Sequence, residues 1–105
     1  MGVKMEIREL QDEIKKIASK LESLDNRAFG KDGVFLHLIE EVGEIARNLF
    51  DEISGRAKFE KEKLGDEIAD AIAMLFHLAL LYDIDLESQI EKKVKELKLR
   101  FGVEA

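Results

Sequence analysis

One apolar stretch constrains the fold of this chain more than any other feature. From Ile68 to Tyr82 the sequence is IADAIAMLFHLALLY, and only Asp70 and His77 interrupt the apolar residues. A helix that is apolar on nearly every side is expected to be buried on every side. A monomer of four helices has difficulty covering one helix completely, so the stretch predicts a partner subunit. An unpaired carboxylate is costly in such a setting, and Asp70 therefore needs a partner.

Helical spacing extends along the rest of the chain, so we expect one all-α domain spanning residues 1–105. There is no proline, and the composition of 46% hydrophobic and 38% charged residues is typical of a folded protein. We expect the subunit to be an antiparallel four-helix bundle. The predicted helices run from Val3 to Leu24, from Val34 to about Ile53, from Phe59 or Glu60 to about Tyr82, and from the N-cap Asp85 to just before Gly102.

Composition and charge exclude several classes of protein. The absence of cysteine rules out disulfides and thiolate metal ligands. The net charge of −6 argues against nucleic-acid binding, and the run from Ala71 to Tyr82 is too short to cross a membrane. Residues Met1–Glu6 lead directly into an amphipathic pattern, so we expect no signal peptide and a cytoplasmic location.

Two pairs of acidic residues have the spacing that places both members on one helix face. Glu67 precedes Asp70 by three positions, and Glu41 precedes Glu44 by three. A short connection joins their helices, which we expect to pack as an antiparallel hairpin that brings the four carboxylates together. Two other interpretations stay open: the Glu41–Glu44 pair lies on a solvated helix face, or Asp70 forms a structural hydrogen bond or ion pair.

Four converging carboxylates would repel one another unless a cation lay among them. Oxygen ligands without histidine or cysteine favour magnesium, manganese or calcium over zinc. Magnesium usually keeps several waters and is completed by substrate phosphates. The four acids therefore predict a metal site with phosphate-ester chemistry.

These residues resemble the MazG-like family of all-α nucleoside triphosphate pyrophosphohydrolases. The resemblance rests on E41-x-x-E44 followed by E67-x-x-D70, within the segments HLIEEVGEIA (residues 37–46) and GDEIADA (residues 65–71). The loop from Asn26 to Gly33 is similar to an arginine- and glycine-containing loop of some members. The similarity extends roughly from Asp25 to Arg100, and the four-acid motif is its most specific part.

The resemblance implies magnesium-dependent hydrolysis of a (deoxy)nucleoside triphosphate, possible also with Mn²⁺, to a monophosphate and pyrophosphate. Glu41, Glu44, Glu67 and Asp70 would be the metal ligands, and we take Glu41 as the catalytic base. Non-standard nucleotides are candidate substrates. Family members are typically dimers or dimers of dimers, in agreement with the partner predicted above.

Two other functions stay open. Phosphoribosyl-ATP pyrophosphohydrolase, an enzyme of histidine biosynthesis, has similar length and chemistry, but its paired acids follow a G-E-E pattern where this chain has E-E-x-G-E. A non-catalytic helical interaction protein would use the acids structurally.

Basic residues are the next candidates, because a triphosphate needs positive charge beyond one metal ion. Arg27 and Lys31 precede the second helix, and Lys93 and Arg100 belong to the fourth. Ordinary surface positions near a helix C-terminus would explain the latter two equally well. His37 shares the face of Glu41 and is a further substrate-binding candidate. A core histidine with a satisfied hydrogen bond is the alternative for His37 and for His77.

Overall fold

Four α-helices make up the regular structure of residues 6–104, the part of the chain that this computed structural model describes. In chain order they are α1 (Ile7–Leu24), α2 (Lys31–Ser54), α3 (Lys61–Leu81) and α4 (Leu86–Arg100). No strand occurs in residues 6–104, and the all-α prediction is confirmed. Within the same residues, no helix has both the length and the apolar character needed to cross a membrane.

The helix ends lie where caps and turn residues interrupt the helical pattern. Gly55 ends α2 with a φ of 67°, a left-handed conformation that glycine adopts without steric cost. Asp85 caps α4 as predicted, because its side chain accepts a hydrogen bond from the second backbone N–H of that helix. α2 begins at Lys31 rather than at Val34. The predicted start of the first helix, Val3, lies outside the described residues, together with the opening segment 1–5.

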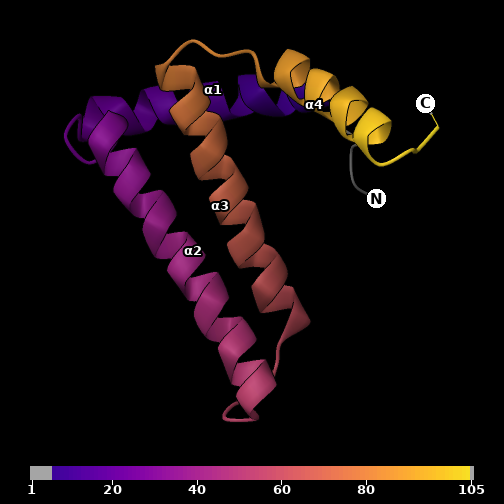
Figure 1. Cartoon of the computed structure of the whole chain (residues 1–105). Coiled ribbons are helices and arrows are strands. Elements are labelled where there is room, and N and C mark those ends of the chain that lie inside the picture. Colours follow the sequence, from indigo (N-terminus) through magenta and orange to yellow (C-terminus); the bar gives the residue numbers. More distant parts are fainter. Residues whose placement is uncertain (1–5, 105) are drawn as a thin grey trace, which may run out of the picture.

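α2 and α3 form a long antiparallel hairpin (Figure 1). Each helix contributes one stripe, at helical spacing, to their line of contact, which we call the seam. Val34 of α2 is fully enclosed there, and Ala71 of α3 is 8% exposed. The seam residues, all buried or half-buried, are Val34, Leu38, Glu41, Ile45 and Asn48 of α2 and Leu64, Glu67, Ala71, Met74 and Leu78 of α3. The seam is thus apolar at its ends and polar near its middle.

α1 lies across one end of the hairpin, where α2 begins and α3 ends (Figure 1). A buried polar contact joins it to α3: His77 is 2% exposed, and its Nε2 lies 3.0 Å from Oε1 of Glu22. Ala18 of α1 is buried at the same junction of helices. His77 is therefore a core histidine with a satisfied hydrogen bond, and this interpretation of the sequence is confirmed.

The side chain of Gln11 on α1 fixes the position of the chain between α3 and α4. Its Nε2 donates to the carbonyl oxygen of Ile84 at 2.7 Å, and its Oε1 accepts from the backbone N–H of Leu86 at 3.2 Å. Arg8 adds an exposed ion pair with Asp85 at 3.1 Å. These contacts hold the start of α4 against α1, and Figure 1 shows α4 beside α1 rather than beside the hairpin.

The four helices do not close into a bundle within one chain. The radius of gyration is 16.4 Å, whereas a compact domain of this length has one of about 13 Å. The apolar sequence of α3 led us to expect a helix buried on all sides, and within one chain this is wrong. Ile68, Ile72 and Leu75 are 42–48% exposed, and Asp70 is exposed. A two-helix hairpin has two open faces, and α1 covers only its end.

Replacing Gln11 by Ala should destabilise the fold by about 1–3 kcal/mol, because one backbone N–H and one carbonyl group lose their partner. Urea unfolding followed by circular dichroism measures this change in the free energy of unfolding. Gln89→Ala, at an exposed position of α4, is the matched control and should change it little. Equal effects of the two substitutions would contradict the role assigned to Gln11.

Candidate functional site

The candidate site lies in the middle of the seam, where carboxylates from α2 and α3 face each other. Glu67 of α3 is 7% exposed, and one of its carboxylate oxygens, Oε1, accepts a hydrogen bond from the side-chain amide of Asn48 on α2. Glu41 of α2 is half-buried. The antiparallel pairing therefore brings one acid from each predicted pair into the contact between the helices.

The environment of Glu41 disfavours the charged form of its carboxyl group. Its Oε2 is buried and has no hydrogen-bond partner among the described residues. Desolvation by burial raises the pKa of this carboxyl group, and the charges of Glu44, Asp70 and Glu67 raise the pKa further. Because these three charges act on Glu41, each of the other predicted acids lies within electrostatic range of Glu41.

The second member of each pair is exposed. Glu44 and Asp70 each follow a seam residue by three positions, a rotation of about −60° around the helix axis. In an antiparallel hairpin equal rotations turn both side chains toward the same side, which we call the acidic face. The sequence context of Asp70 indicated that this residue is enclosed among apolar side chains. Asp70 is instead exposed to solvent, near the buried Glu67.

The acids are near one another without forming a finished metal cage. Among residues 6–104, no three side chains of histidine, aspartate or glutamate are close enough to hold a metal ion. Mutual repulsion keeps carboxylates apart when no cation lies between them. Magnesium needs only one or two carboxylates, because water and substrate phosphates complete its octahedron. The unpartnered Oε2 of Glu41 and the oxygen-only donor set fit Mg²⁺ or Mn²⁺.

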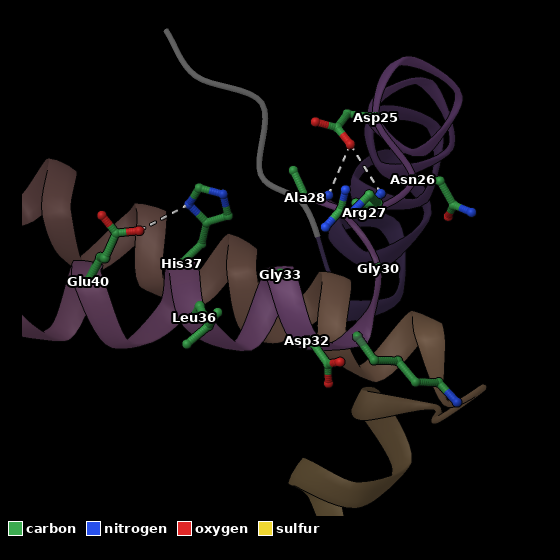
Figure 2. Close-up of a pocket in the computed structure, with 11 residues that line it drawn as sticks. Asp25, Asn26, Arg27, Ala28, Gly30, Asp32, Gly33, Leu36, His37 and Glu40 are labelled. Carbon is green, nitrogen blue, oxygen red and sulfur yellow. Dashed lines mark hydrogen bonds and ion pairs between the residues drawn. The ribbon is translucent and has the colours of Figure 1, made fainter.

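A cavity of about 910 Å³ lies where the loop after α1 meets the start of α2, and we call it the corner pocket (Figure 2). Asp25 orders the loop, because its Oδ1 accepts from the backbone N–H groups of Arg27 and Ala28 at 3.1 Å. The loop touches α2 at Gly33, where a Cβ atom would lie 2.0 Å from the carbonyl oxygen of Ala28. The lining residues are Asp25, Asn26, Arg27, Ala28, Gly30, Lys31, Asp32, Gly33, Leu36, His37 and Glu40.

His37 lies on the wall of the corner pocket and is exposed, so the core interpretation of this histidine is wrong. Its ring stacks on that of Phe29, with centroids 6.0 Å apart and planes at 10°, and its Nδ1 lies 3.5 Å from Oε1 of Glu40. Lys31 places its Nζ 4.3 Å from the centre of the Tyr82 ring. Three of the predicted substrate-binding residues, Arg27, Lys31 and His37, thus share one cavity.

The other two predicted substrate-binding residues lie elsewhere. α4 packs on α1, so a single chain does not bring Lys93 or Arg100 to the acids. Lys93 pairs with Glu96, with Nζ 2.6 Å from Oε2, and the guanidinium of Arg100 lies 6.0 Å from the centre of the Phe101 ring.

A smaller cavity contains residues that the sequence analysis missed. It has a volume of about 340 Å³ and adjoins the acids on the side of the 55–60 turn; we call it the seam pocket. Asn48, Arg47 and Lys63 are the missed residues, and spacing offered a signal for each. Asn48 follows Glu44 by four positions, Arg47 follows it by three, and Lys63 precedes Glu67 by four. The lining residues are Glu44, Arg47, Asn48, Asp51, Lys63 and Glu67.

Comparison with known proteins identifies no relative. No protein-family model, no curated protein and no solved structure matches the chain. The family resemblance of the four-acid motif stays a prediction.

Replacing Glu41 by Gln should stabilise the metal-free protein at neutral pH. Because the pKa of Glu41 is higher in the folded state than its ordinary value of 4.5, the folded state binds the proton more tightly. Stability should therefore fall as the pH rises from about 4.5 through the raised pKa, and this fall should be absent from Glu41→Gln. Melting temperatures in chelator across this range measure the effect.

Glu52→Gln, at an exposed position of α2, is the control, and it should keep the decline of the wild type. Identical pH profiles for wild type and Glu41→Gln would show that the burial of this carboxylate has no energetic consequence.

Proposed function

We propose that this chain is a magnesium-dependent nucleotide pyrophosphohydrolase, which converts (deoxy)nucleoside triphosphates, including non-standard ones, to monophosphates and pyrophosphate. The observation that carries the proposal is the unpartnered, buried Oε2 of Glu41, surrounded by the charges of Glu44, Asp70 and Glu67. A buried anion with neither a donor nor a counter-ion is destabilising. A divalent cation would relieve that cost at Glu41 and the repulsion among all four acids.

The roles of the acids follow from their surroundings. Asn48 fixes the orientation of Glu67, which suits a ligand that must hold one geometry. Glu44 and Asp70 are exposed and can reach an ion on the acidic face. The raised pKa of Glu41 suits a base that takes a proton from an attacking water molecule. Magnesium, when bound, would bridge phosphate oxygens and stabilise the charge that develops on them.

The corner pocket is the proposed site of the nucleoside. A nucleobase can stack on aromatic rings, and the pair of Phe29 and His37 offers such a surface. Arg27 and Lys31 add positive charge near the sugar and the first phosphate. His37 belongs to the same helix face as Glu41, so a ligand in this pocket can extend along α2 to the acids.

We further propose that two chains pair through the hairpin. The residues that follow the seam stripes by one position are apolar in both helices, and in an antiparallel hairpin they lie on the side opposite the acidic face. We call this surface the apolar face. Its members, 40–84% exposed, are Phe35, Ile39, Val42 and Leu49 of α2, with Ile53 one turn further on, and Ile68, Ile72 and Leu75 of α3.

The accessible surface supports this pairing. It amounts to 8481 Å², whereas a compact protein of this mass has roughly 6,000 Å². The excess is comparable with the area that each subunit of an obligate dimer covers. Two apolar faces packed together would make a four-helix core from two hairpins, and pairs of such dimers would give the larger assembly.

Purified protein incubated with magnesium and a panel of nucleoside triphosphates should release pyrophosphate. Glu41→Gln should lower kcat by about 10²–10⁴-fold, the usual contribution of a general base, and Asp70→Asn should also lose the magnesium-dependent rise in melting temperature. Glu52→Gln, an exposed acid near the end of α2, should behave as the wild type.

The panel includes phosphoribosyl-ATP, and turnover confined to it would replace the proposed substrate. No turnover, together with a melting temperature that magnesium does not change and a more stable Asp70→Asn, would leave only the non-catalytic function.

A charge placed on the apolar face should dissociate the dimer. Ile39→Glu and Ile72→Glu should each sediment as monomers in analytical ultracentrifugation at concentrations where the wild type is a dimer. Leu99→Glu, at an 85% exposed leucine of α4, is the matched control and should remain dimeric. A monomeric wild type, or dissociation by Leu99→Glu alone, would contradict the proposed interface.

A further inference from the structure

We propose that the seam pocket is the subsite of the departing pyrophosphate, with Arg47 and Lys63 as its cations. The inference rests on the proposed function, and it adds a direction to it: the nucleotide lies along the hairpin with its nucleoside toward α1 and its terminal phosphates toward the 55–60 turn. None of the basic residues expected from the sequence belongs to this pocket.

Glu44 and Glu67, two of the four acids, also line the seam pocket, so the pocket continues directly from the proposed metal site. Arg47 lies three residues beyond Glu44 on α2, a rise of about 4.5 Å along the helix axis. A phosphate chain held at the acids therefore needs to extend by only about one phosphoanhydride link to meet Arg47.

The two cations are also free to bind a ligand. Among residues 6–104, no carboxylate lies within ion-pair distance of Arg47 or Lys63, although Glu44, Asp51 and Glu67 line the same pocket. Both side chains are exposed, so binding a phosphate would not require them to leave a buried partner.

The donors of the pocket suit a phosphate group. A guanidinium binds phosphate oxygens through two parallel hydrogen bonds, and an ammonium adds a point charge with three donors. Asn48 gives one amide hydrogen to Glu67 and keeps a second as a donor. Three different side chains thus present N–H groups around one small cavity.

The opposite end of the site is less suited to phosphates. Both pockets contain three carboxylates and two basic residues, but in the seam pocket two of the carboxylates, of Glu44 and Glu67, are proposed metal ligands. One of the basic residues of the corner pocket, Lys31, has its ammonium over the Tyr82 ring. The stacked rings of Phe29 and His37 and the larger volume match a nucleoside better than a diphosphate, and these differences between the pockets set the proposed direction.

Binding of pyrophosphate in the presence of magnesium tests the subsite without turnover. By isothermal titration calorimetry, Arg47→Gln and Lys63→Gln should each raise the Kd for pyrophosphate about tenfold or more, as expected when a charge-assisted hydrogen bond is lost. Lys61→Gln, an exposed lysine near the start of α3, is the matched control and should leave the Kd within about twofold. The Kd for a nucleoside monophosphate should not change in any of the three variants.

Steady-state kinetics provide a second test, which distinguishes a loss of pyrophosphate binding from a general loss of structure. With a nucleoside triphosphate, Arg47→Gln should raise KM and the inhibition constant of pyrophosphate together, while unchanged circular dichroism and melting show that the fold is intact. Arg47→Lys should restore part of the affinity, because it keeps the charge and loses the bidentate geometry.

The possible failures are distinguishable. An unchanged pyrophosphate Kd in Arg47→Gln and Lys63→Gln, or a raised one only in Arg27→Gln, would overturn the subsite and the direction while leaving the enzyme proposal intact. A wild type that binds magnesium pyrophosphate through Arg47 and Lys63 but hydrolyses no nucleotide would overturn the enzyme proposal and the role in product departure, and it would leave the pocket as a binding site for pyrophosphate alone.

Discussion

The antiparallel packing of α2 against α3 is the contact on which the rest of the molecule depends. It encloses Val34 and Ala71, and it also brings Glu41 and Glu67 into an interface from which water is largely excluded. One of these acids is satisfied by Asn48, whereas Oε2 of the other has no partner. The same interface therefore stabilises the fold through apolar burial and loses stability at Glu41. Such a local loss of stability is typical of functional sites.

Helix number and helix ends could be predicted because their causes are local. Apolar periodicity predicted the helices, and the chemistry of Asp85 predicted where the last one begins, whereas the start of α2 lies three residues before the predicted Val34. The crossing of α1 over the hairpin could not be predicted in this way. This crossing depends on the hydrogen bond from Gln11 to the carbonyl group of Ile84 and on the contact between Glu22 and His77. These residues are far apart in the sequence, and nothing in the sequence pairs one with the other.

The candidate site follows the same division. Spacing alone predicted that Glu41 and Glu44 share one helix face and Glu67 and Asp70 another, and that the two pairs approach each other. Spacing did not predict the exposure of Asp70. An apolar sequence indicates that most of a helix is buried, but it does not indicate whether the same chain or a partner buries it. Arg47 and Lys63 have helical spacing to Glu44 and Glu67, but other exposed basic residues have similar spacings to acids, and only the packing of the two helices shows that these two lie beside the site.

α2 and α3 carry their apolar residues and their acids on opposite sides of one thin layer. A partner that covers the apolar face leaves the carboxylates open to solvent. Under the two-fold pairing proposed above, the acids of the two chains would point away from each other, and no small ligand could bridge them. Each chain would then meet its substrate independently, without competition at a shared entrance. Under these proposals the two helices would separate assembly from chemistry, although they would supply the residues for both.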